Sequence, residues 1–429
     1  MTDPLSIGLA VINVVAAVSG ISARDLITKM TTAKAAREGQ KLEKYRKDLA
    51  EYATPQKVRE FVSGLYGGGM GPLRQVRIRA GAGSYLTSMF SRKEFLGTSF
   101  LPDDMMLTYD KTVGKAPLDV SATSAIEALA PRVLANLAIQ GVKIWNSPTY
   151  RLLRIGDSHP LRATVGKVGF LEYRFGSGLV TDELAEALVD SKGDVATVLE
   201  ERYTRCPIRV SILGDSHQLS DYSSRLCCGG VSGILAFARP APHHDYYIPY
   251  MVRSNKVSEN RGRIGLLPVG FHQPMVDGSQ EMPLDLSLYR EIYEELFGGS
   301  DAEQLGSHIT PDWYLSQEPM SYFKEHENGF RCEVVSYGVN ASTGNYEFGL
   351  LLYVPDTWFY KTYSGRFRSN WEPESIHWLS TTNTEKIAEL IADPNWTDEC
   401  RLALTHGLVR LASLDPHRVK LPVLATELV

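Results

Sequence analysis

Along the C-terminal half of the chain, the pattern of hydrophobic and polar positions alternates between that of strands and that of helices. Runs rich in β-branched and aromatic residues, bounded by turn residues, predict strands. They lie at Ile234–Ala238, Tyr246–Val252, Cys332–Tyr337 and Tyr346–Val354. Longer amphipathic runs predict helices at Leu284–Gly299, Thr384–Ala392 and Asp398–Leu414. The pattern predicts an α+β unit.

The N-terminal half has a more mixed pattern. Helices are predicted at Arg24–Tyr52, Gln56–Tyr66, Ser124–Gln140 (interrupted by Pro131), Thr181–Leu188 and Asp194–Tyr203. Strands are predicted at Gln75–Arg79, Thr149–Ile155 and Ala163–Tyr173. Because 429 residues are long for one domain, we expect an N-terminal helical segment (1–70), an accessory α+β domain (71–204) and a C-terminal domain (205–429). The Gly-rich stretch Gly67–Pro72 lacks phosphate-loop spacing and is interpreted as the first hinge.

The helix predicted at Leu284–Gly299 has an acidic side. Glu291, Glu294 and Glu295 occupy positions i, i+3 and i+4, so their carboxylates share one face. Leu288, Ile292 and Leu296 are spaced by four on another face, which can pack on a sheet. Carboxylates this close repel one another, and Mg²⁺ is the hard, oxygen-binding cation that relieves this repulsion. We therefore expect a metal site here, with Arg290 orienting Glu294.

The segment Arg290–Glu295 resembles the core of the Nudix box, Arg-Glu-aliphatic-x-Glu-Glu. The flanks depart from that pattern. Met282 and Val276 stand where the family has Glu and Gly upstream, with Glu281, Gly270 and Gly278 as the nearest equivalents. Downstream, Phe297 takes the place of Gly, and Gly298 comes one residue late. The strands before the helix, and the acidic-then-Trp segment Trp371–Leu379 after it, extend the resemblance over roughly residues 205–425.

The resemblance implies a fold and an activity. The fold is a Nudix-type α/β/α sandwich with a mixed sheet, and the activity is Mg²⁺-dependent hydrolysis of a nucleoside diphosphate linked to another group. Catalytic roles would fall on Arg290, Glu291, Glu294 and Glu295, with the three carboxylates as metal ligands and Mn²⁺ as the alternative ion. Such enzymes use a further carboxylate as base or ligand; the candidates are Glu347, Glu372 and Glu374.

Two other classes of function remain open. The displaced glycines and Met282 fit a Nudix-fold protein that has lost catalysis and binds a nucleotide as a sensor. A purely structural assembly protein is the third reading, for which neither nucleotide nor metal should shift thermal stability. In all three, a net charge of −5 gives no global field for nucleic acid, and the partner expected for the first two is a nucleotide-type small molecule.

Five cysteines, an odd number without a Cys-x-x-Cys motif, indicate reduced thiols and a cytoplasmic protein. The seventeen uncharged residues Leu5–Ile21 are short for a membrane span. They predict either a helix buried in a bundle or in a self-association interface, or a contact that holds the protein at the membrane.

Two further motifs carry weaker chemistry. Gly156–His159 and Gly214–His217 repeat the tetrapeptide Gly-Asp-Ser-His. The second copy, in the strand-like run Val210–Ser216, resembles the nucleophile block of SGNH esterases, but no downstream Asp-x-x-His pair follows and a turn is favoured. His243, His244 and Asp245 are adjacent and are interpreted as a solvated loop, since neighbouring side chains of a strand face opposite sides.

Overall fold

The computed structural model describes residues 35–68, 71–112, 120–142, 146–156, 160–257, 259–275, 278–299, 310–326, 329–368 and 372–429. Its helices are α3 (Ala35–Tyr52), α4 (Pro55–Tyr66), α5 (Val120–Ile139), α6 (Phe170–Arg174), α7 (Leu179–Asp190), α8 (Val195–Glu200), α9 (Arg202–Arg205), α10 (Pro207–Leu213), α11 (Leu284–Glu291), α12 (Ser321–Glu325), α13 (Thr357–Tyr363), α14 (Thr384–Ala392) and α15 (Asp398–Leu414). The helix or membrane contact predicted at Leu5–Ile21 lies outside these residues.

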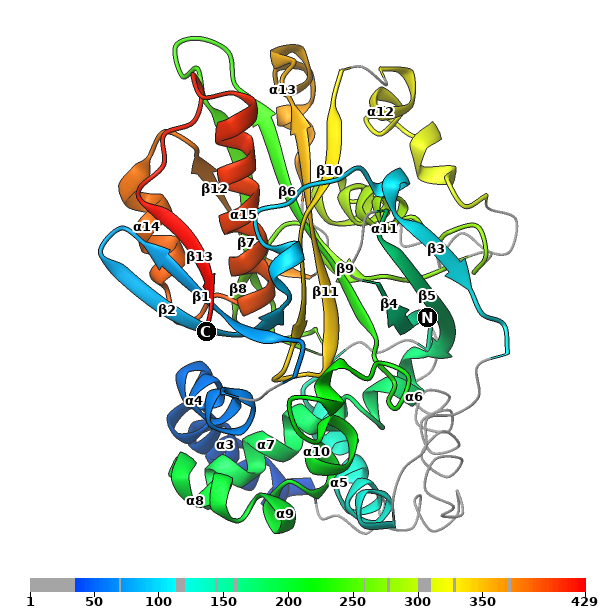
Figure 1. Cartoon of the computed structure of the whole chain (residues 1–429), viewed down its shortest axis with the longest axis vertical. Coiled ribbons are helices and arrows are strands. Elements are labelled where there is room, and N and C mark those ends of the chain that lie inside the picture. Colours follow the sequence, from blue (N-terminus) through cyan, green and yellow to red (C-terminus); the bar gives the residue numbers. More distant parts are fainter. Residues whose placement is uncertain are drawn as a thin grey trace.

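Ten of the described strands form one large mixed sheet (Figure 1). The order along the sheet is β12 (Pro373–Ser380), β7 (Tyr246–Arg253), β6 (Gly229–Ala238), β11 (Asn345–Val354), β10 (Arg331–Asn340), β2 (Gly83–Ser91), β1 (Arg74–Ala80) and β13 (Leu424–Leu428), with β8 (Ile264–Leu266) on β7 and β9 (Val269–Phe271) on β6. The central pair β6 and β11 is parallel. A second sheet contains β3 (Met106–Tyr109), β5 (Arg162–Gly169) and β4 (Pro148–Ile155).

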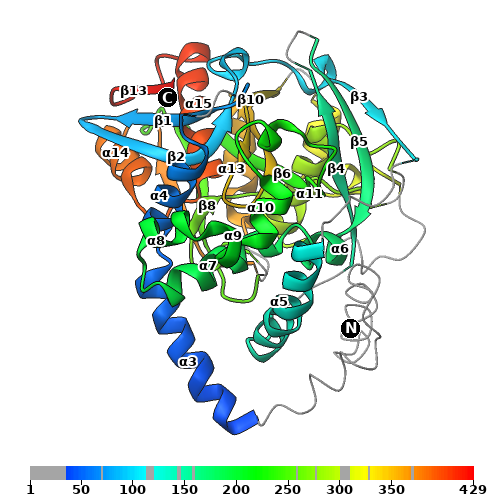
Figure 2. The same ribbon diagram turned by 60° about the horizontal axis from the view of Figure 1, so that its bottom comes forward.

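Apolar residues on both faces of the large sheet are buried, so helices can cover both sides. Along β6, Val231, Leu235 and Phe237 belong to one hydrophobic cluster, and Ile234 and Ala236 belong to the other. This alternation is the period-two pattern of a strand buried on both faces. Helices α14 and α15 pack on the second cluster, whereas α11, the small sheet, α4 to α8 and α10 pack on the first. The protein is therefore a layered α+β structure (Figures 1 and 2).

The large sheet crosses the second of the boundaries expected from the sequence, and the first hydrophobic cluster crosses both. Strands β1 and β2, from the expected accessory stretch, pair with β13 and β10 from the C-terminal stretch. The first hydrophobic cluster runs from Phe61 to Tyr363 and so includes side chains from all three stretches. The division into three domains stays a prediction. In the structure, the stretches on either side of the expected boundaries share one hydrophobic cluster, and the second and third stretches also share the large sheet.

Most elements lie where the sequence predicts them, and α14 and α15 have the predicted bounds. Three local predictions are wrong. The expected strand Ala163–Tyr173 ends at Gly169 and continues as helix α6, because a short apolar run does not distinguish strand from helix. Pro131 does not interrupt α5, which continues through it. The strand-like run before Ser216 is helix α10, so the strand that the esterase resemblance requires is absent there.

The prediction of unpaired cysteines is confirmed, because all five thiols are free and buried. The loop predicted at His243–Asp245 is confirmed for the two exposed histidines. Asp245, however, is buried, with hydrogen bonds of 2.8 and 2.6 Å from the Arg239 guanidinium.

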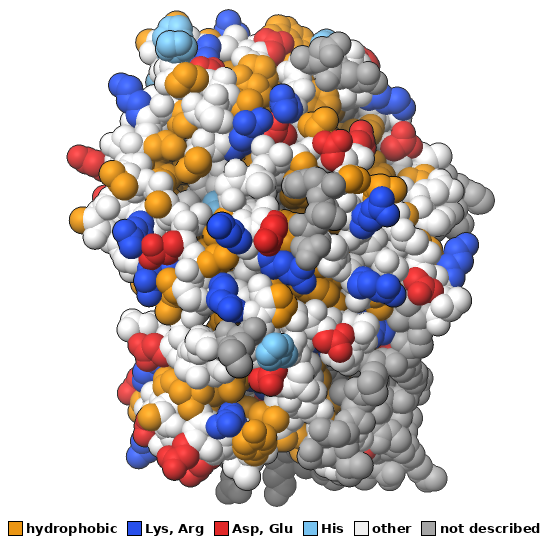
Figure 3. All heavy atoms as spheres, viewed as in Figure 1, with side chains coloured by type: hydrophobic (Ala, Val, Ile, Leu, Met, Phe, Trp, Pro, Cys, Tyr) orange, Lys and Arg blue, Asp and Glu red, His pale blue; other side chains and the backbone are white. Residues whose placement is uncertain are grey.

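No helix among the described residues is both long and apolar enough to cross a bilayer. On the face shown in Figure 3, acidic and basic side chains of the described residues are interspersed.

Candidate functional site

Helix α11 presses its apolar face onto strand β6. Leu288 and Ile292 are fully buried, as predicted from their spacing. Gly233 of β6 makes this close approach possible: a Cβ there would lie 2.5 Å from Leu288 Cδ1. After Glu291 the helix widens into a π-helical turn, Ile292–Leu296. Such turns inside α-helices are frequent at functional sites.

The helix stops where the glycines predict. Gly298 has a φ of +64°, a conformation that glycine adopts without strain. The Gly299 amide donates to the Tyr293 carbonyl at 2.9 Å, and the Arg368 amide donates to the Leu296 carbonyl at 2.8 Å. These bonds satisfy carbonyls of the last turn and fix the end of the segment that carries Glu294 and Glu295.

Glu295 is the most deeply buried carboxylate of the acidic helix, with no exposed area. Its Oε2 accepts a 3.1 Å hydrogen bond from the Val269 amide of β9. Its Oε1 is buried and has no hydrogen-bond partner among the described residues. Burial raises the pKa of the Glu295 carboxyl well above its usual range, and the charges of Glu372 and Glu291 raise it further.

Glu291 lies against the backbone of β9. A Cβ on Gly270 would approach Glu291 Cδ to 2.3 Å, so glycine is the residue that admits this carboxylate. Arg290 donates to Glu291 Oε1 at 2.8 Å and to the Gln273 carbonyl at 2.9 Å. Burial lowers the pKa of Arg290, but the charges of Glu291 and Glu294 outweigh burial and hold that pKa above its usual value. Arg290 thus holds the Glu291 carboxylate in place, and the charge of Glu294, which the sequence predicted it to orient, also acts on it.

The structure distinguishes among the three candidates for a further carboxylate. Glu372 lies just before β12, and its charge acts on Glu295. Its Oε2 lies 3.6 Å from Arg253 Nη2. Glu374 is exposed. Glu347 lies on β11 between Tyr346 and Phe348, which face the cluster containing α11, so it points to the opposite side of the sheet. Burial raises the pKa of Glu347, as do the charges of Glu399 and Glu259, which are not box carboxylates.

The arrangement brings Glu291 and Glu372 within electrostatic reach of Glu295, and Glu294 is half-buried. Among the residues that the structure describes, no three Asp, Glu, His or Cys side chains are close enough together to hold one metal ion. The sequence reasoning missed Arg253 and Gly270. In the sequence, Gly270 appeared only as a displaced glycine of the box. No local pattern indicates that Arg253 pairs with Glu372, which lies far along the chain.

Neither the protein-family models nor the curated proteins include a match to this chain.

We expect Gly270→Ala to displace the Glu291 carboxylate, because the new methyl group would overlap Glu291 Cδ. If the box binds Mg²⁺, the increase in Tm caused by millimolar Mg²⁺ should shrink or vanish in this variant. Gly265→Ala is the matched control, since its Cβ would meet only Cys400 Sγ at an ordinary 3.6 Å. A Mg²⁺ response that survives in Gly270→Ala would show that Glu291 does not contribute to ion binding.

Proposed function

We propose that this chain is a Nudix-type hydrolase that cleaves, with Mg²⁺, the pyrophosphate bond of a nucleoside diphosphate linked to another group. The observation that carries the proposal is Glu295, a fully buried carboxylate with one unpartnered oxygen beside the charges of Glu291 and Glu372. Burying carboxylates together costs several kcal/mol unless a cation or proton compensates them. A divalent cation accounts for both the clustered charge and the unpartnered oxygen.

The layered fold agrees with this proposal. In the Nudix-type sandwich proposed for residues 205–429, α11 covers one face of the mixed sheet, and α14 and α15 cover the other. The box resemblance supplies the family, and the position of α11 beside β9 supplies a place for the acidic side of the helix. Residues 71–204 then form the accessory part, which shares the sheet through β1 and β2.

Each proposed residue has a distinct part. Glu291, Glu294 and Glu295 would hold Mg²⁺ (or Mn²⁺), with Glu372 as the added ligand or base that the geometry favours over Glu347 and Glu374. When bound, the ion polarises a phosphoryl oxygen and lowers the pKa of coordinated water. Arg290 fixes the Glu291 carboxylate, and the Val269 amide fixes Oε2 of Glu295. Arg253 restrains Glu372 at the entrance to β12.

A panel of nucleoside diphosphate derivatives, incubated with and without Mg²⁺, tests the proposal. We expect at least one compound to release a nucleoside monophosphate and a phosphorylated second product, and EDTA to stop the release. The absence of turnover across the panel with both Mg²⁺ and Mn²⁺ would overturn the assignment as a hydrolase.

The second candidate is a nucleotide sensor with a weak or inactive box, coupled to an N-terminal self-association or membrane-contacting helix. One observation favours it: the described carboxylates are near one another, but no three of them are grouped for one ion. A Glu295 that stays protonated would need no metal. The same panel separates the candidates, because a sensor binds a nucleotide and raises its own Tm without releasing product.

A further inference from the structure

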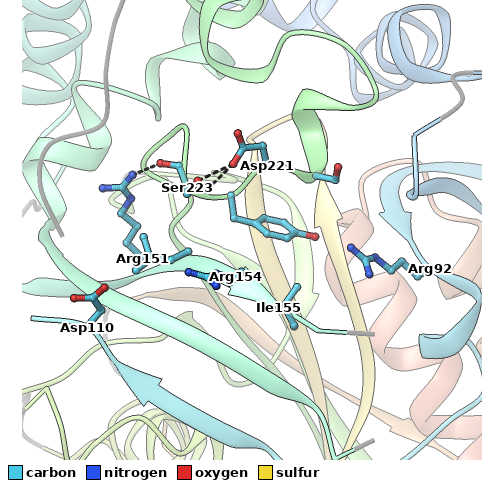
Figure 4. A pocket seen from close by; sticks show the side chains of 10 residues that line it. Arg92, Asp110, Arg151, Arg154, Ile155, Asp221 and Ser223 are labelled. Atoms are coloured by element: carbon cyan, nitrogen blue, oxygen red, sulfur yellow. Dashed lines mark hydrogen bonds between the residues drawn. The ribbon is translucent and has the colours of Figure 1, made fainter. Parts of the chain in front are cut away.

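A cavity of about 540 Å³ lies between the end of β2, strand β4 and the loop 220–223 (Figure 4). The box carboxylates do not line it. Three arginines do: Arg92 follows β2, and Arg151 and Arg154 belong to β4. Figure 4 shows Arg154 between the other two arginines. Three positive side chains from two parts of the fold therefore gather at one hollow in a chain whose net charge is −5.

Two aspartates also line this cavity, and local hydrogen bonds occupy one oxygen of each carboxylate. Asp110 Oδ1 accepts hydrogen bonds from the amide and hydroxyl of Thr112, at 2.8 and 2.7 Å. Asp221 Oδ1 accepts hydrogen bonds from the amide and hydroxyl of Ser223, at 3.2 and 2.8 Å. Both are Asx-type turns that shape the wall. The two carboxylates balance two of the three guanidinium charges, so the cavity carries an excess positive charge.

The wall is held in place by buried contacts. Arg151 is buried and donates to the Arg225 and Ser223 carbonyls, at 2.9 and 2.6 Å. Tyr222, which is 3 % exposed, also lines the cavity, and its hydroxyl interacts with that of Tyr337. By contrast, Arg154 is exposed, and the described part of the chain gives it no hydrogen bond.

We propose that this cavity binds a phosphate-bearing small molecule, with Arg154 as a direct contact to the phosphate. Guanidinium groups pair with phosphate oxygens through two parallel N–H donors, which makes arginine the residue of choice for this anion. The volume lies within the range of small-molecule pockets, about 300–1,000 Å³. The negative net charge of the chain disfavours a polyanion such as nucleic acid. The proposal does not depend on the box being active.

Isothermal titration with inorganic pyrophosphate and with ATP, in EDTA, tests this site on the full chain. EDTA removes metal-dependent binding at the box. We expect saturable binding to the wild type. Arg154→Ala should weaken the affinity at least about tenfold, because one charge-assisted contact is lost, and Arg154→Glu should abolish binding. Arg162→Ala, an exposed arginine on the adjacent strand β5 that does not line the cavity, is the matched control and should bind like the wild type.

Three results would overturn the proposal. The first is the absence of saturable binding by either probe to the wild type. The second is equal affinity in Arg154→Ala and the wild type. The third is loss of binding in Glu295→Gln, which would move the anion to the box. Citrate, an anion without phosphate, provides the specificity arm: binding as tight as that of pyrophosphate would mean that the cavity attracts anions in general and does not select phosphate.

Discussion

Glu295→Gln is expected to abolish Mg²⁺-dependent hydrolysis and, in the same protein, to raise the free energy of unfolding at neutral pH. The amide keeps the size of the side chain and an oxygen to accept from Val269, so the fold should persist. Its NH₂ replaces the unpartnered Oε1 and turns repulsion from Glu372 and Glu291 into hydrogen bonding. We expect a gain of about 1–3 kcal/mol, the usual cost of an unsatisfied buried polar group.

The raised pKa of Glu295 determines how the stability difference between Glu295→Gln and the wild type depends on pH. The pKa of Glu295 is raised in the folded state above its ordinary value of 4.5. The native state therefore binds a proton more tightly than the unfolded chain does. The resulting stabilisation is fully present below the unfolded pKa and is lost as the pH rises through the folded pKa. The advantage of Glu295→Gln over the wild type should be near zero at about pH 4 and should grow as the pH rises.

Urea unfolding of both proteins from pH 4 to pH 8, in EDTA, measures this difference, and a hydrolysis assay in Mg²⁺ measures the loss of activity. Glu374→Gln is the matched control, an exposed glutamate two residues from Glu372 that should leave both activity and stability unchanged. Wild-type turnover by Glu295→Gln would contradict the metal-ligand role. A pH-independent stability difference would contradict the raised pKa.

Asp398→Ala is expected to produce the largest loss of stability, about 3–5 kcal/mol, because it leaves buried positive charge without its partner. Asp398 begins α15 and is 4 % exposed. It accepts hydrogen bonds from Arg59 Nε at 3.0 and 2.9 Å and from the Ser88 amide and hydroxyl, both at 2.8 Å. It thus ties α4 and β2 to α15. The loss should appear as a lower urea midpoint.

Burial favours the neutral acid at Asp398, but the charges of Arg59 and Arg401 hold its pKa below the usual range. A depressed folded pKa contributes stability that is present above the unfolded pKa, about 3.9, and is lost as the pH falls through the folded value. The difference between wild type and Asp398→Ala should therefore be constant near pH 7 and should narrow below about pH 4. Asp190→Ala, an exposed helix aspartate, should change stability by less than about 0.5 kcal/mol. A comparable loss in both variants would contradict the charge argument.

Local pattern predicts the acidic helix well and its chemistry only in part. The spacing of Leu288, Ile292 and Leu296 predicts the buried face, because a helix repeats every three to four residues whatever it packs against. The same spacing assigns three equivalent carboxylates to one side. In the structure they are not equivalent: Glu295 is fully buried, Glu291 is clamped by Arg290 and Glu294 is half-buried. The π-helical turn at Ile292–Leu296 changes their directions, and no residue pattern indicated it.

The sequence alone determined the α+β class, most helix and strand positions, the free cysteines and the acidic helix, since all of these follow from composition and local periodicity. Only the tertiary structure decided that β1 and β2 share the main sheet with β10 and that Glu372, not Glu347, lies beside Glu295. It also decided that three arginines meet at one cavity. The physical reason is that strand order and the facing of distant side chains depend on packing between segments far apart in the chain, which periodicity does not encode.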